Sequence, residues 1–95
     1  MWTRFMDMHS GGGRKLDWEY IFIEATQDEA EVVFYNKFDR SPSRVTCTCC
    51  GEDYYVSEYP TLEQASEYER RGEGMKEFAL RQDVLIIPAS STTTE

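Results

Sequence analysis

The pattern of hydrophobic and polar positions begins with a two-residue alternation over residues 2–9, the period of a β-strand. A serine and three consecutive glycines at residues 10–13 then interrupt it. Residues 20–23 are apolar on both faces and predict a central strand. The first part of the chain is therefore predicted to hold two strands on either side of a glycine-rich segment.

Two capping boxes mark the starts of two predicted helices. In a capping box, a threonine oxygen and a side chain three residues later satisfy backbone N–H groups that are free at a helix start. Thr26 and Glu29 form the first box. Thr61 and Gln64 form the second, which opens a helix that extends to about Arg71.

The first of these helices has one apolar side. The stripe has the spacing of a helix that packs on a core and consists of Ala30, Val33, Phe34 and Phe38. The Ser-Pro pair at residues 41–42 is predicted to end this helix, because proline disfavours helical backbone in the residue before it.

Three further stretches are predicted as strands. Residues 44–48 and 54–57 are predicted to be joined through a turn that contains all three cysteines. Residues 84–87 form the last predicted strand, which Pro88 closes. The order β-β-α-β-β-α-β predicts an α+β fold, with a small, mostly antiparallel sheet of about five strands and two helices packed on one face.

Length and composition indicate a single folded domain. The chain has 95 residues, of which 40% are hydrophobic and 14% aromatic, enough for one modest core. Residues 1–88 are predicted to form the domain, and the Ser/Thr-rich residues 89–95 a disordered tail. No apolar run reaches the roughly 20 residues of a membrane span, and the first residues lack the features of a signal peptide. We therefore expect a protein of a reducing cytoplasm.

The negative charge gathers in the second half of the chain. The net charge is −8; residues 1–50 hold 6 basic and 8 acidic side chains, and residues 51–95 hold 4 and 10. Nucleic-acid binding needs a basic face, so we expect no direct contact with nucleic acid. The charge instead favours a basic partner, such as a nucleic-acid-binding protein, or serves only to keep a small protein soluble.

The glycine-rich segment is a candidate anion site. Three glycines in a row exceed what a hairpin turn needs, and such a loop can direct backbone N–H groups at an anion. Arg14 and Lys15 add positive charge beside it. The alternative is a flexible connector, because the spacing matches neither of the common nucleotide-binding loops.

The cysteine segment is a candidate zinc site. Cys47 and Cys50, followed by Gly51, have the spacing of one zinc knuckle, but no second knuckle follows. Cys49 and His9, the only histidine, could complete the ligand set. The alternative is that the cysteines are small buried hydrophobes. No nucleophile with an orienting base is recognisable, so we expect no enzymatic activity.

Two sets of candidate residues follow from these patterns. Contacts to a ligand or partner are predicted for Asp7, His9, Ser10, Gly11, Gly12, Gly13, Arg14, Lys15, Glu52, Asp53 and Tyr54. Metal ligands are predicted at Cys47, Cys49, Cys50 and His9, and the ion that they would hold is Zn²⁺.

The same two segments resemble the signature stretches of a family of short, uncharacterised proteins encoded by tailed bacteriophages. The likeness rests on residues 6–13 (MDMHSGGG), 16–18 (LDW) and 45–54 (VTCTCCGEDY), and extends through residues 61–65. Residues after Gly72 are not covered by it. The resemblance implies a small phage protein that is made in the cytoplasm of an infected bacterium.

This context favours a protein that acts by binding. We expect a host-interaction or anti-defence protein, an inhibitor of bacterial immunity that masks a host protein or sequesters a small anionic ligand such as a nucleotide. The alternative is a zinc-stabilised structural or interaction module without an inhibitory role. The sequence leaves the oligomeric state open.

Overall fold

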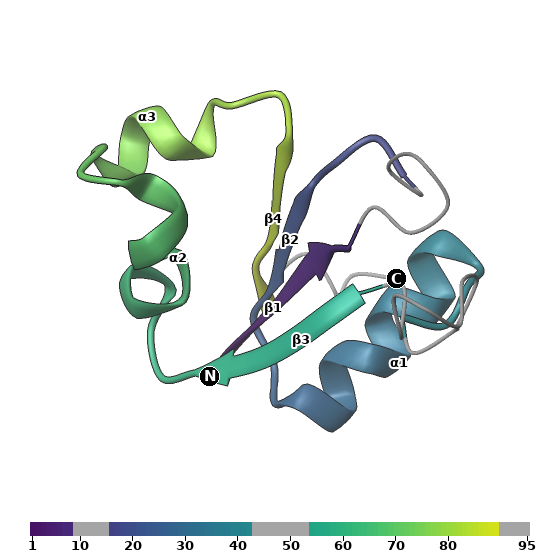
Figure 1. The fold of residues 1–95 in the computed structure, drawn as a ribbon. Coiled ribbons are helices and arrows are strands. Elements are labelled where there is room, and N and C mark those ends of the chain that lie inside the picture. The colour runs from purple at the N-terminus through teal and green to yellow at the C-terminus, as the bar shows by residue number, and fades with distance from the viewer. Residues whose placement is uncertain (9–15, 43–53, 90–95) are drawn as a thin grey trace.

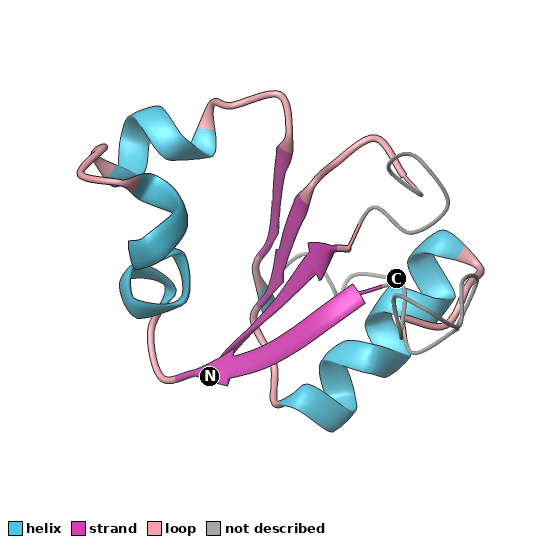
Figure 2. Cartoon of the chain, viewed as in Figure 1, coloured by secondary structure: helices cyan, strands magenta, loops and turns pink. Residues whose placement is uncertain are grey.

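A computed structural model of the chain describes residues 1–8, 16–42 and 54–89 (Figures 1 and 2). Its helices and strands confirm the predicted α+β class. In chain order they are β1 (Trp2–Asp7), β2 (Tyr20–Ile23), α1 (Gln27–Phe38), β3 (Tyr54–Tyr59), α2 (Leu62–Arg70), α3 (Met75–Ala79) and β4 (Val84–Ile87).

The described strands form one four-stranded mixed sheet in the order β3-β1-β2-β4. β1 runs antiparallel to β2 and to β3, whereas β2 and β4 are parallel. The sheet is therefore not antiparallel throughout, because the chain crosses from β3 at one edge to β4 at the other through α2 and α3. The predicted strand at residues 44–48 lies outside the described residues.

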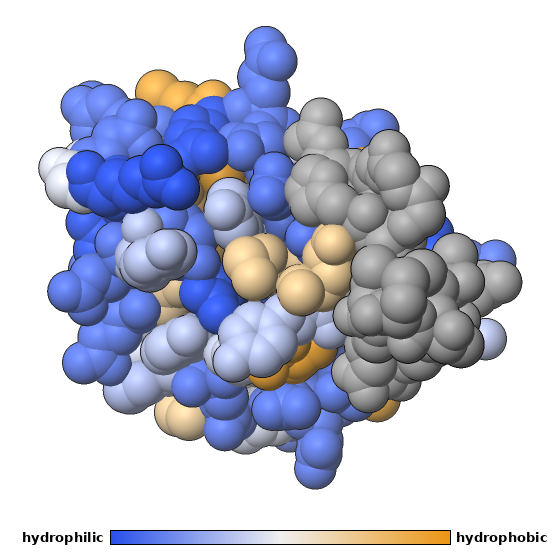
Figure 3. Space-filling model, viewed as in Figure 1, coloured by the Kyte–Doolittle hydropathy of each residue, from blue (hydrophilic) through white to orange (hydrophobic). Residues whose placement is uncertain are grey.

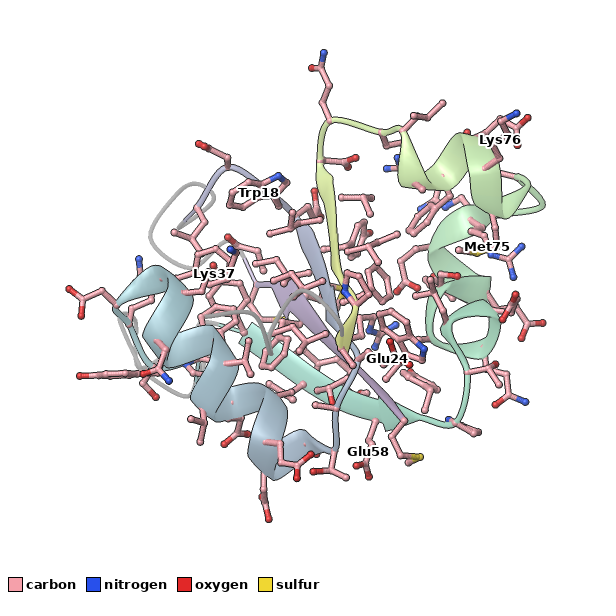
Figure 4. All side chains as sticks on the ribbon, turned by 180° about the vertical axis from the view of Figure 1, so that it is seen from behind. Trp18, Glu24, Lys37, Glu58, Met75 and Lys76 are labelled. Atoms are coloured by element: carbon pink, nitrogen blue, oxygen red, sulfur yellow. The ribbon has the colours of Figure 1, made fainter. Side chains whose placement is uncertain are left out.

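The helices cover both faces of the sheet, and the prediction that they share one face is wrong. Phe5, Ile21 and Ile23 point to the face that α1 covers, where they pack with Phe34. Phe22 points to the other face and packs among residues of α2, α3 and β4. Figures 1 and 4 show the sheet between α1 and the α2–α3 pair. Because β2 is apolar on both sides, each face of the sheet requires its own cover.

α1 begins as predicted and ends earlier. Its N-cap is Thr26, whose side chain accepts a hydrogen bond from the backbone N–H of Glu29. Asp39 then adopts a left-handed conformation, with φ of 57°, and its N–H donates to the carbonyl of Tyr35. This left-handed cap ends the helix at Phe38, before the Ser-Pro pair is reached.

α2 and α3 form the second cover. Thr61 is the N-cap of α2 and accepts from the N–H of Gln64, as the capping box predicts. Arg71 and Gly72 have positive φ values of 52° and 89° and turn the chain after α2. α3 was not predicted, because it has five residues and its N-cap, Gly74, offers no side-chain cap.

Two glutamates tie chain segments to the sheet (Figure 4). Glu58 of β3 accepts a hydrogen bond of 2.9 Å from the backbone N–H of Gln27, the first residue of α1. Glu24, just after β2, accepts one of 3.0 Å from the N–H of Ala89. Ala89, predicted as the start of a disordered tail, is therefore held against the sheet.

Candidate functional site

Most of the predicted site residues lie outside the described residues. They belong to residues 9–15 and 43–53 and are His9, Ser10, Gly11, Gly12, Gly13, Arg14, Lys15, Cys47, Cys49, Cys50, Glu52 and Asp53. The predictions of an anion site and of a zinc site therefore stay predictions. Of the predicted residues, the structure describes Asp7 and Tyr54.

Asp7 and Tyr54 lie directly opposite each other in the β1–β3 ladder. Asp7 is the last residue of β1, which leads into the glycine-rich segment, and Tyr54 is the first residue of β3, which follows the cysteine segment. The two segments therefore join the sheet at the same end of the same strand pair. The sequence separation of the two segments gives no hint of this proximity.

Asp7 and Tyr54 are both buried, with exposed fractions of 2% and 1%. The ring of Tyr54 packs edge-on against that of Phe34, with a centroid distance of 5.0 Å. The backbone N–H of Asp7 donates to the carbonyl of Glu19 at 2.9 Å, just before β2 begins. In this structure the two residues anchor the segments to the core and do not contribute to the exposed surface.

Among the described residues, Met8 and Tyr55 are large exposed side chains at this end of the sheet, with exposed fractions of 40% and 53%. Tyr55 pairs in register with Met6, which is half-buried. Figure 3 shows apolar and weakly polar atoms gathered over the ends of β1 and β3. We call Met6, Met8 and Tyr55 the β1–β3 end patch.

Sequence reasoning selected Tyr54 and missed its neighbour Tyr55. The two-residue period of a strand could have identified Tyr55, because successive side chains of a strand point to opposite faces of the sheet. Once Tyr54 is placed in the core, Tyr55 has to point to the other face. There its ring lies beside the guanidinium of Arg4, with the central carbon 5.7 Å from the ring centroid.

A hollow of about 480 Å³ is lined by Asp17, Arg81, Gln82 and Asp83. Arg81 donates to both carboxylate oxygens of Asp83, at 3.1 and 2.8 Å. These hydrogen bonds raise the pKa of Arg81 above its usual value. The guanidinium is therefore already engaged by a carboxylate of the protein itself, which makes this hollow a poor anion site.

Neither a metal centre nor a membrane span is found within the described ranges. In residues 1–8, 16–42 and 54–89, no three His, Cys, Asp or Glu side chains are grouped so that they could hold a metal ion. No helix of this part of the chain is long and apolar enough to cross a membrane. Comparisons of the chain with family models, with curated proteins and with solved structures found no match.

Proposed function

We propose that this is a small phage accessory protein that acts by binding inside an infected bacterium. As a host-interaction or anti-defence protein, it masks a host protein or sequesters a small anionic ligand. The observation that carries the proposal is the pairing of Asp7 with Tyr54, which joins the glycine-rich and cysteine segments to one end of the sheet.

The β1–β3 end patch supports a binding role at this place. Met8 and Tyr55 expose large side chains beside the attachment points of both segments. Exposed methionine and tyrosine are enriched at protein interfaces, because they offer large contact areas once water is displaced. The patch lies beside the residues at which both segments join the sheet, and we propose the contact surface at this place.

The ligand could be a protein or a small anion. For an anion, the backbone N–H groups of residues 11–13 would supply the donors, and Arg14 and Lys15 the compensating charge. For a protein, the patch would supply the apolar contacts and the net charge of −8 would attract a basic partner.

A zinc-stabilised interaction module is the second candidate. A knuckle at Cys47 and Cys50 needs further ligands from elsewhere in the chain. The register pair of Asp7 and Tyr54 favours this candidate, because Asp7 stands two residues before His9 and Tyr54 four residues after Cys50 in the chain. Zinc would then stabilise the contact surface without taking part in chemistry.

Affinity capture from infected-host lysate tests the proposal. The whole protein serves as bait, bound proteins are identified by mass spectrometry, and small molecules released on heating are analysed in parallel. Tyr55→Ser is expected to reduce the captured partner or ligand strongly. Tyr68→Ser is the matched control, because Tyr68 is a tyrosine of α2 with an exposed fraction of 78%.

The control has to separate binding from folding, since Tyr55 also contacts Arg4. Circular dichroism melting of both variants shows whether the fold is kept. If neither a protein nor a small molecule is enriched, or if Tyr55→Ser captures the same partner as the control, the proposed binding surface is wrong.

A further inference from the structure

On the side that faces away from the sheet, α1 exposes two large side chains next to two carboxylates. Asp28, Glu31, Val32 and Tyr35 stand at positions i, i+3, i+4 and i+7 and therefore form one stripe along the helix. Val32 and Tyr35 have exposed fractions of 59% and 53%. The core is filled from the other side of α1, so packing within the domain does not account for these two side chains.

The stripe forms one wall of a groove. The groove has a volume of about 320 Å³ and continues from the stripe to the segment that follows α1; it is lined by Asp28, Glu31, Val32, Tyr35, Asn36, Ser41 and Pro42. This volume is at the lower end of what ligand pockets have, about 300–1,000 Å³. It suits one or two large side chains of an incoming chain. We call it the α1 groove.

The charge of the α1 groove is negative. Asp28 and Glu31 supply two carboxylates, and no lysine or arginine is among the described residues that line the groove. Within the part of the chain that the structure describes, Glu31 is contacted by the side-chain amide of Gln27 at 3.4 Å, a long and exposed hydrogen bond that does not neutralise its charge. The charge of Asp28 has a local role as well, because an acidic residue in the first turn stabilises a helix. Glu31, one turn further on, is not explained in this way.

We propose that the α1 groove docks a basic segment of a partner protein. A large apolar side chain of that segment inserts between Val32 and Tyr35, and its lysine or arginine side chains pair with Asp28 and Glu31. Charge complementarity selects this occupant, because an acidic rim around an apolar wall excludes an acidic segment and attracts a basic one. The α1 groove shares no residue with the β1–β3 end patch, so this proposal stands independently of the proposed function.

The test uses the whole ¹⁵N-labelled protein and two synthetic peptides. The first is an amphipathic peptide with leucine at positions i, i+3, i+4 and i+7 and lysine at the others; the second has glutamate in place of lysine. The lysine peptide is expected to shift the amide signals of residues 28–36 and 41, and the glutamate peptide to leave them unchanged. The affinity should fall as salt is added, because salt screens exposed charges.

Variants assign the contacts. Val32→Ser and Tyr35→Ser are each expected to weaken binding of the lysine peptide about tenfold, which corresponds to about 1.4 kcal/mol. Asp28→Asn with Glu31→Gln is expected to remove most of the salt dependence. Tyr68→Ser lies outside the groove and should leave the affinity for the peptide unchanged.

Three results would overturn the proposal. The first is that the lysine peptide does not bind, or shifts signals elsewhere. The second is equal binding of both peptides. The third is a dimer in sedimentation experiments that is lost on Val32→Ser, since a second copy of the chain would then occupy the groove. None of these results affects capture through Tyr55, so the two proposals fail separately.

Discussion

Arg4 of β1 and Glu69 of α2 form an ion pair in which the two side chains have exposed fractions of only 8% and 1%. Nη1 of Arg4 donates to Oε2 of Glu69. Within the described residues, Nε of Arg4 and Oε1 of Glu69 have no hydrogen-bond partner. The rings of Tyr55 and Tyr59 lie beside the guanidinium. This pair fixes α2 on the face of the sheet opposite to α1.

Removing one partner of this pair should destabilise the protein strongly. Glu69→Ala leaves the charge of Arg4 buried and unpaired, and is expected to lower the free energy of unfolding by about 3–5 kcal/mol. Replacing both residues, as Arg4→Met with Glu69→Leu, should cost far less, because neither charge is then buried. Urea unfolding of Arg4→Met, of Glu69→Leu and of the double variant gives the coupling energy. A loss in the double variant equal to the sum of the losses in the two single variants would show that the pair is not coupled.

Tyr20 should make the stability depend on pH in the alkaline range. Burial raises the pKa of its phenol above 10.0, and the nearby carboxylates of Glu19 and Glu69 add to this, while Arg81 acts against it. A raised pKa means that the folded state keeps the proton longer than the unfolded state. The stabilising contribution is therefore complete below the unfolded pKa and is lost as the pH rises through the folded pKa.

Melting temperatures between about pH 9 and pH 11 measure this effect of Tyr20. Tyr20→Phe is expected to decrease the alkaline loss of stability relative to the unchanged protein. Tyr68→Phe should not, because Tyr68 is an exposed residue of α2. An identical pH profile for Tyr20→Phe would contradict the prediction.

The glycine-rich segment is tested by one substitution. If residues 11–13 surround an anion or approach a partner closely, Gly12→Val should abolish binding, since a β-branched side chain restricts the backbone and occupies the space of the ligand. The fold should be kept, as judged by circular dichroism. Normal capture by Gly12→Val would identify the segment as a connector.

The zinc site is tested by elemental analysis of protein purified without a metal-affinity tag. If the cysteine segment holds zinc, close to one zinc per chain is expected, falling in Cys47→Ser and Cys50→Ser, because a knuckle places two thiolates on one ion. Since such a site is assembled by folding, a chelator should lower the melting temperature substantially. A metal-free protein that melts equally with and without chelator would leave the cysteines as core or redox residues.

The sequence by itself determined the local elements. A two-residue period predicted β1, the apolar run at residues 20–23 predicted β2, and the boxes at Thr26 and Thr61 predicted the starts of α1 and α2. These features depend on neighbouring residues, whose spacing fixes a helical or extended backbone before any long-range contact forms. The sequence does not predict the α3 helix, because a five-residue helix without a side-chain cap leaves only a weak local pattern.

The tertiary structure alone decided how the elements are arranged. It placed α1 and α2 on opposite faces of the sheet, set β4 parallel to β2, and paired Asp7 with Tyr54. Each of these outcomes joins residues that are far apart in the chain, and local periodicity specifies neither the partner of a strand nor the face on which a connection crosses. Phe22 is buried under α2 and α3, and Phe5 is buried under α1. The helices lie on opposite faces because a sheet that is apolar on both sides needs a helix layer on each face.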